Sequence, residues 1–142
     1  MDIQQIIEEN GGVFLQAPEE TASRLKQIKA FLFDWDGVFN AGIKSKTFGS
    51  PFSEPDSMGL NMLRYSYWLI HGELPYVAII TGQKNESAVE YAEREHLQAI
   101  FLNAKNKLEA LAEIQNQTSF KKDEFAFVFD DIIDLGLAKE CG

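Results

Sequence analysis

The sequence holds a single cysteine, Cys141, and only two histidines, His71 and His96. One cysteine excludes an internal disulfide framework and a cysteine-based zinc cluster. Two histidines are too few for a histidine-rich metal site, and both are expected at the surface or at helix ends. Basic residues are also scarce, with 13 Lys and Arg against 22 Asp and Glu and a formal net charge of −9. Nucleic acid and acidic membrane surfaces need a basic footprint, so neither is an expected partner.

Long apolar runs are missing as well. No stretch approaches the roughly 18 apolar residues of a membrane span. The start, Met1-Asp2-Ile3-Gln4, lacks the basic and apolar regions of a signal peptide. We therefore expect a cytoplasmic protein. What the chain does have is 45% hydrophobic residues, including 11 Phe, spread over 142 residues. This length and composition favour one domain with a sizeable core.

Short apolar runs alternate with amphipathic stretches along most of the chain. The runs at residues 29–34, 76–80, 99–102 and 125–129 are predicted strands. Continuous apolar runs of this length are typical of parallel strands that are covered on both faces. Alternation of such strands with helices predicts an α/β fold, a Rossmann-like parallel sheet with right-handed crossovers.

Helices are predicted between and before these strands. In the domain at residues 29–142, they begin at Asp56, as the N-cap, at Asn85-Glu86 and near Lys105. The last of these carries Leu108, Leu111 and Ile114 and gives way to a polar turn at residues 115–119. Residues 2–9 and a stretch from Ala17-Pro18 predict two further short helices, in an N-terminal extension at residues 1–28. Residues 40–55, rich in Gly and Pro, fit a short hairpin or flap and fit a plain loop equally well.

Polar residues follow three of the four predicted strands. Asp34 ends the first strand and Asp36 comes after it, Thr81-Gly82 follow the second, and Asp130-Asp131 follow the fourth, with Asp134 shortly after. Ligands of parallel sheets bind at the carboxyl ends of strands, and residues i and i+2 of an extended segment point the same way. Taken singly, each feature also fits a turn or a helix start, since Asp-Gly is common turn chemistry and acids favour helix N-termini.

Together these residues suit phosphoryl transfer. Carboxylates that converge repel each other without a cation, and oxygen-only ligands select a hard metal, Mg²⁺ when phosphate is the partner. An Asp can attack phosphorus, and a second Asp can serve as acid and base. A hydroxyl and a lysine such as Lys107 can hold the phosphoryl oxygens.

In this order, Asp34-x-Asp36-Gly37-Val38, Thr81-Gly82, a lysine that opens a helix and Asp130-Asp131-x-x-Asp134 resemble the four motifs of the haloacid dehalogenase superfamily phosphatases. Within it the chain is similar to the small 3-deoxy-D-manno-octulosonate 8-phosphate phosphatases and the acylneuraminate 9-phosphate phosphatases. The likeness is carried by residues 33–42, 77–84 and 106–111 and by the acids from Asp130. It implies a haloacid dehalogenase-like domain with a flap hairpin at residues 43–55 and no cap domain.

The resemblance also implies a role for each residue. Asp34 corresponds to the nucleophile and a metal ligand, and Asp36 to the acid/base whose backbone carbonyl binds Mg²⁺. Lys107 corresponds to the phosphoryl-stabilising lysine, for which Lys105 fits less well. The remaining positions are the phosphate-binding Thr81 and Gly82, the metal-binding Asp130 and Asp134, the supporting Asp131, and the substrate-binding Asn40, Gln83 and Asp56. Family members form tetramers in which the flap borders a neighbour's active site, so a homo-oligomer is expected.

Two functions remain open. The first is a Mg²⁺-dependent phosphatase that hydrolyses a small phosphorylated sugar or sugar acid through an aspartyl-phosphate at Asp34. The alternative is a catalytically weak phosphatase-like module with an oligomerisation or regulatory role. It is motivated by Phe129 and Gln83, where the family usually has glycine and the subgroup arginine, and by the chain stopping at Gly142. A response-regulator receiver domain is disfavoured, because it lacks an Asp-Asp-x-x-Asp run after its lysine.

Overall fold

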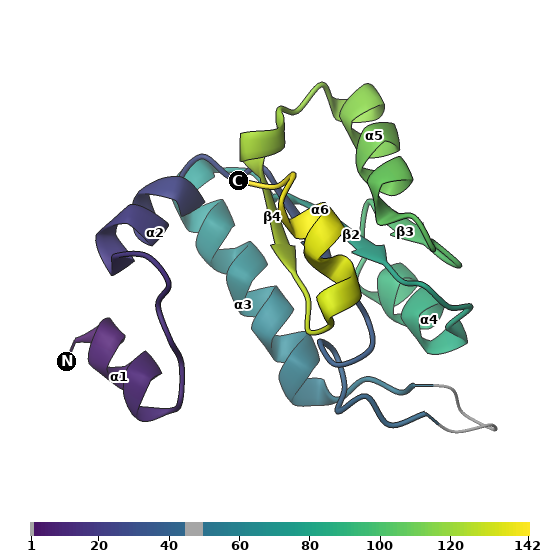
Figure 1. Cartoon of the computed structure of the whole chain (residues 1–142), viewed down its shortest axis with the longest axis horizontal. Helices are drawn as coiled ribbons and strands as arrows, with labels where there is room; N and C mark the ends of the chain where they lie inside the picture. The colour runs from purple at the N-terminus through teal and green to yellow at the C-terminus, as the bar shows by residue number, and fades with distance from the viewer. Residues whose placement is uncertain (1, 45–49) are drawn as a thin grey trace.

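Four short strands form one parallel sheet in the order β3-β2-β1-β4 (Figure 1). The computed structural model describes residues 2–44 and 50–142. The strands are β1 Ala30–Phe33, β2 Tyr76–Ile80, β3 Ala99–Phe101 and β4 Phe125–Val128. Strand β1 lies inside the sheet, where Ala30 pairs with Tyr76 on one side and with Phe125 on the other. Each strand falls within its predicted range, and the predicted parallel α/β fold is confirmed.

Helices cover both faces of this sheet. The helices α3 Glu54–His71 and α4 Glu86–Arg94 pack on the face that holds Phe31 and Phe33. The helices α5 Lys107–Thr118 and α6 Leu135–Ala138 pack on the opposite face, with Ala30 and Leu32. Because side chains alternate along a strand, β1 supplies both cores and is buried throughout.

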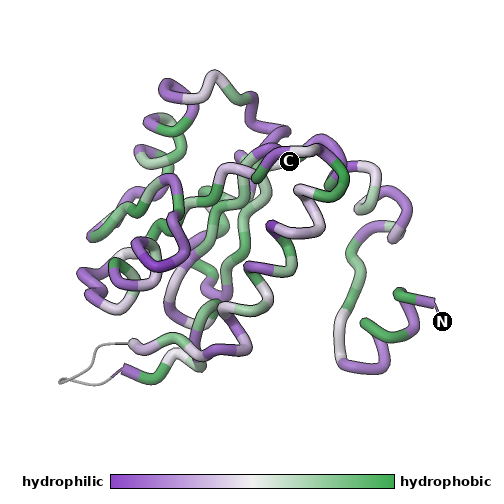
Figure 2. Tube along the Cα trace, turned by 180° about the vertical axis from the view of Figure 1, so that it is seen from behind, coloured by the Kyte–Doolittle hydropathy of each residue, from purple (hydrophilic) through white to green (hydrophobic). Residues whose placement is uncertain are grey.

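The N-terminal helices stand beside these layers (Figures 1 and 2). Both α1 Ile3–Glu9 and α2 Pro18–Leu25 form where the sequence predicts them, and neither contributes a buried residue. The core begins with Ile28, which is 2% exposed. The division into an extension and a domain stays a prediction. Within the part of the chain that the structure describes, no helix is long and apolar enough to cross a membrane.

The segment between β1 and α3 contains no strand within residues 34–44 and 50–53. In these described residues the structure therefore agrees with the prediction of a plain loop. The tip of the predicted flap, residues 45–49, lies outside the described residues.

Two predicted helix boundaries are wrong. Helix α3 has Ser53 as its N-cap, not Asp56, which lies in the first turn. The Ser53 hydroxyl accepts from the Asp56 backbone N–H, and Pro55 suits the first turn because it has no N–H to satisfy. Helix α5 begins after its N-cap Asn106 and continues through the residues predicted as a polar turn. There Thr118 Oγ1 donates to the Ile114 carbonyl, and the helix ends only at Ser119, in the left-handed region at φ 61°.

The three apolar residues noted on this helix are not buried alike. Leu108 is 43% exposed, whereas Ala110, Leu111 and Ile114 carry the buried face of α5. Two short 3-10 turns complete the chain, η1 Lys122–Glu124 before β4 and η2 Ile132–Asp134 before α6. The second turn places Asp134 among the buried residues.

Candidate active site

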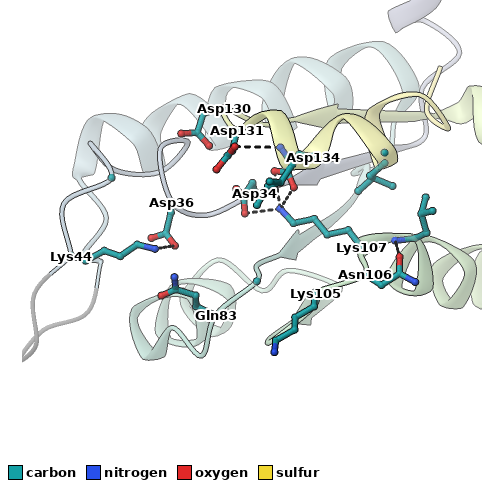
Figure 3. A pocket seen from close by; sticks show the side chains of 17 residues that line it. Asp34, Asp36, Lys44, Gln83, Lys105, Asn106, Lys107, Asp130, Asp131 and Asp134 are labelled. Atoms are coloured by element: carbon teal, nitrogen blue, oxygen red, sulfur yellow. Dashed lines mark hydrogen bonds and ion pairs between the residues drawn. The ribbon is translucent and has the colours of Figure 1, made fainter.

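The ends of β1, β2 and β4 meet at one edge of the sheet, as their parallel order requires. Asp34, next after β1, donates its backbone N–H to the Val128 carbonyl at 2.9 Å, and Thr81, next after β2, donates to the Phe101 carbonyl at 2.9 Å. A cavity of about 680 Å³ opens at this edge (Figure 3). Most predicted site residues line it, namely Asp34, Asp36, Gly82, Gln83, Lys107, Asp130, Asp131 and Asp134. The structure thus brings together residues from the whole length of the domain.

Three predicted residues do not line this cavity. Thr81 is 1% exposed, and its hydroxyl accepts from the Asn85 side chain at 3.3 Å. Asn40 braces the loop after β1, where its Nδ2 donates to the Trp35 carbonyl at 3.3 Å and its Oδ1 accepts from the Gly42 N–H at 2.9 Å. Asp56 lies in the first turn of α3 and hydrogen-bonds with Ser53.

Lys107 lies between two carboxylates at the centre of the site (Figure 3). Its Nζ is 2.9 Å from Asp34 Oδ1 and 2.8 Å from each carboxylate oxygen of Asp134. All three side chains are nearly buried, at 9% exposed for Lys107, 11% for Asp34 and 2% for Asp134. Burial raises the pKa of Asp134, and the Asp34 carboxylate adds to this, while Lys107 opposes it. Lys105 also lines the cavity, but Lys107 makes these ion pairs.

Asp36 has one engaged oxygen and one that is orphaned. Its Oδ2 lies 3.2 Å from Lys44 Nζ and accepts from Asn85 Nδ2 at 3.4 Å. Its Oδ1 is buried and has no hydrogen-bond partner among the described residues. A buried carboxylate oxygen without a donor is costly, and a cation or a protonated substrate group satisfies it.

Lys44 and Asn85 are site residues that the sequence did not reveal. Asn85 was predicted to start a helix, and it is the N-cap residue of α4. Its side chain makes no capping hydrogen bond, however, and instead bridges Asp36 and Thr81. A polar residue at a cap position predicts a cap, so no local signal marks this second use. Lys44 comes from the segment after β1 and reaches Asp36 only through the fold of that segment.

The loop after β4 approaches the loop after β1 at Gly37. Gly37 has φ +84°, and a Cβ at this residue would overlap the Asp130 carboxylate. Glycine therefore both permits the turn and makes room for that acid. Asp131 caps η2 by accepting from the Ile133 N–H at 3.2 Å. The Phe129 ring stacks on Phe127, with centroids 5.2 Å apart, and it is not among the residues that line the cavity.

The residues present fit a hard cation. Among the described residues no three His, Cys, Asp or Glu side chains form a ready-made metal cluster. Mg²⁺ does not require one, since it commonly binds one or two carboxylates together with waters and substrate phosphate. The acids Asp34, Asp36 and Asp130 at the same cavity supply oxygen-only donors, and the buried Asp36 Oδ1 leaves room for a positive or proton-bearing partner beside it.

Several solved structures share this fold, although no family model matches the chain. One is 3-deoxy-D-manno-octulosonate 8-phosphate phosphatase from Moraxella catarrhalis, in complex with magnesium, phosphate and KDO. It is 27% identical over 88% of this chain and 70% of that chain, with a TM-score of 0.73. A Legionella pneumophila protein assigned to subfamily III A of the haloacid dehalogenase superfamily hydrolases is 26% identical, over 99% of this chain and 71% of that chain, with a TM-score of 0.73.

A third structure supports the fold alone. The cobalt-bound octulosonate 8-phosphate phosphatase from Haemophilus influenzae is 24% identical over 84% of this chain and 68% of that chain, with a TM-score of 0.70. In the residues that the structure describes, no cap domain interrupts the layers around the sheet. The chain has the haloacid dehalogenase fold and, among proteins of that fold, resembles the 3-deoxy-D-manno-octulosonate 8-phosphate phosphatases.

Proposed function

We propose that this chain is a Mg²⁺-dependent phosphatase that hydrolyses a small phosphorylated sugar or sugar acid. The observation that carries the proposal is the ion pair between Asp34 and Lys107 at the end of β1, beside the cavity. Lys107 Nζ lies 2.9 Å from Asp34 Oδ1. A carboxylate held beside a lysine at the end of a parallel strand suits attack on an anionic phosphoryl group. The magnesium, phosphate and KDO bound to the Moraxella catarrhalis protein support the metal and the substrate class.

The proposed reaction has two steps. In the first, an Asp34 carboxylate oxygen bonds to phosphorus, the ester P–O bond breaks, and Asp36 gives its proton to the departing sugar oxygen. In the second, Asp36 takes a proton from water, whose oxygen attacks phosphorus and releases inorganic phosphate and the Asp34 carboxylate. Lys107 holds phosphoryl oxygens through this change. The Thr81 hydroxyl, which does not line the cavity, supports the site through its hydrogen bond with Asn85.

Mg²⁺ would be held by the carboxylates of Asp34 and Asp130 and by the backbone carbonyl of Asp36. When bound, it neutralises phosphoryl charge and lets several acids share one cavity. Asp134 keeps Lys107 in place and supports the metal site, and Asp131 supports the loop that carries Asp130. Gln83 and Gly82 line the wall where the sugar would lie, whereas Asn40 and Asp56 do not reach it.

The test is phosphate release from a panel of sugar phosphates, including octulosonate 8-phosphate and acylneuraminate 9-phosphate. Release is expected with Mg²⁺ and is expected to stop with EDTA and in Asp34→Asn. The matched control is Asp123→Asn, since Asp123 lies in η1 at the other end of the sheet. Undiminished turnover by Asp34→Asn overturns the aspartyl-phosphate step.

A second candidate function is a phosphatase-like module without turnover. It is favoured by Gln83, which stands in the cavity wall with a neutral amide in place of an arginine. This alternative would be supported if calorimetry detects Mg²⁺ binding but no sugar phosphate of the panel releases phosphate. We also propose a homo-oligomer, as in the resembling family, which light scattering in solution tests directly.

A further inference from the structure

Trp35 stands between the two proposed catalytic acids, yet it does not line the cavity. It is fully buried, at 0% exposed, within a cluster of aromatic rings. Its centroid lies 5.1 Å from Phe39, 6.2 Å from Phe52 and 5.6 Å from Tyr91 of α4. The Tyr91 ring in turn lies 4.9 Å from both Phe39 and Phe52. These four rings form one cluster beneath the loop that carries Asp34 and Asp36.

The cluster contacts both ends of the segment between β1 and α3. On the outgoing side, Phe39 stacks on Trp35, and the Asn40 amide donates to the Trp35 carbonyl at 3.3 Å. On the returning side, the Trp35 indole N–H donates to the Ser50 carbonyl at 3.0 Å, in a buried hydrogen bond. Phe52 completes that side, where the Arg94 guanidinium lies 4.6 Å above its ring and fixes it against α4.

The same segment delivers Lys44 to the cavity. Lys44 is part of the cavity wall and lies 3.2 Å from Asp36 Oδ2 (Figure 3). Its side chain is 47% exposed, and so exposed an ion pair is too weak to fix the segment by itself. The position of Lys44 therefore depends on how the two ends of the segment are held. Among the contacts that fix these two ends is the hydrogen bond from the Trp35 indole N–H. A phenylalanine ring has no N–H and cannot make this bond.

We propose that Trp35 is a positioning residue for substrate binding, which holds both ends of this segment and so keeps Lys44 at the cavity. The inference rests on the proposed function, because it assigns Lys44 a contact with an anionic substrate. It goes beyond packing, since any ring of similar size would fill the space, whereas the Trp35 indole also donates its N–H to the Ser50 carbonyl.

The first test uses the two tryptophans of the chain as a matched pair. Trp35→Phe keeps an aromatic ring and loses the N–H, and Trp68→Phe makes the same change on the outer side of α3, where Trp68 is 48% exposed. With 3-deoxy-D-manno-octulosonate 8-phosphate and Mg²⁺, we expect Trp35→Phe to raise KM roughly threefold to tenfold, as for one lost buried hydrogen bond, with little change in kcat. Trp68→Phe should leave both constants unchanged.

A double-mutant cycle tests whether Trp35 acts through Lys44. Lys44→Met should raise KM, and the double variant with Trp35→Phe should be no worse than the poorer single variant. Effects on KM that multiply overturn the proposal. A lower melting temperature for Trp35→Phe at unchanged KM also overturns it, because that is the result of packing alone.

Trypsin cleavage after Lys44 gives a readout that does not depend on turnover. Trp35→Phe is expected to be cut there several times faster than the wild type, and Trp68→Phe at the wild-type rate, with the fragment that ends at Lys44 identified by mass. Equal rates for all three proteins overturn the positioning role. A wild type that releases no phosphate overturns the proposed function instead, while the cleavage rates still decide the role of Trp35.

Discussion

Lys107 Nζ lies 2.9 Å from Asp34 Oδ1, although the two residues come from opposite halves of the chain. The same ammonium group also forms an ion pair with Asp134, so Lys107 neutralises part of the charge of two nearly buried carboxylates. The cavity is also lined by Lys44 and Lys105, so three ammonium groups lie beside its acids in a chain of net charge −9.

Lys107→Met should destabilise the fold as well as the site. Removing one partner of a buried ion pair typically costs about 3–5 kcal/mol, because it leaves an uncompensated charge. Here two carboxylates would face each other without their cation, so we expect a loss of that order in the free energy of unfolding measured with urea. Lys105→Met is the control, expected to change stability by less than about 0.5 kcal/mol, as exposed substitutions do. Equal stability of the two variants would contradict the pairing described here.

Gly37→Ala should damage the site through backbone geometry. Gly37 has φ +84°, and an added Cβ would overlap the carboxylate of Asp130. We expect weaker Mg²⁺ binding by calorimetry and a loss of stability of about 1–3 kcal/mol, as for strained backbone. Gly59→Ala is the matched control, since it lies within α3 with no atom near its Cβ position. That change should stabilise the protein by about 0.5–1 kcal/mol.

Glu95 should make the contact between α3 and α4 sensitive to acid. Burial tends to raise the pKa of Glu95, but hydrogen bonds from Asn61, Arg94 and Ser57 outweigh it and lower the pKa below its ordinary 4.5. A carboxyl whose folded pKa is lowered stabilises the fold above its unfolded pKa, and loses this contribution as pH falls through the folded value. Glu95→Gln should therefore be less stable than the wild type at pH 7.

The difference between the two proteins should shrink as pH falls below about 4.5, the ordinary value for glutamate. Urea unfolding at a series of pH values measures it. Glu93→Gln, on the exposed side of α4, is the control and should follow the wild-type curve. A difference that stays constant down to pH 3 would show that the Glu95 charge is not involved.

Cys141 should react slowly in the folded protein. Burial raises the pKa of its thiol to about 11, and the thiolate is the reactive form. At pH 8 we expect Ellman's reagent to label the native protein on the order of a hundredfold more slowly than the unfolded chain, from the smaller thiolate fraction. Because the chain has one cysteine, the absorbance reports this residue alone. Comparable native and denatured rates would place the thiol in water.

The strands and the order of the strand-end acids were predictable from the sequence, for a physical reason. Residues 30–33 and 76–80 are buried on both faces, so burial leaves an unbroken apolar run in the sequence. Acids directly after such runs, as at Asp34 and Asp130, then fall at one edge through the parallel order alone.

What the sequence did not predict depends on contacts between distant segments. Asn85 carries the signature of a cap, yet its amide turns to Asp36 and Thr81 because those residues lie within reach in the fold. Leu108 has the right spacing for the core, yet it sits at the cavity wall because α5 begins there. Ser53, not Asp56, is the N-cap of α3, because Pro55 is suited to the first turn and places the start of the helix before Asp56.

The place of β1 between β2 and β4 also sets when the site can exist. Strand β1 leaves the ribosome before β2, whereas β4, which completes the pairing of β1, follows only after β2 and β3. Pairings between segments this far apart close slowly, because the entropy of the intervening loop must be lost before the contact forms. A growing chain can thus pair β1 with β2 before Asp130 and Asp134 are made, so the cavity would be completed only after the rest of the sheet has formed.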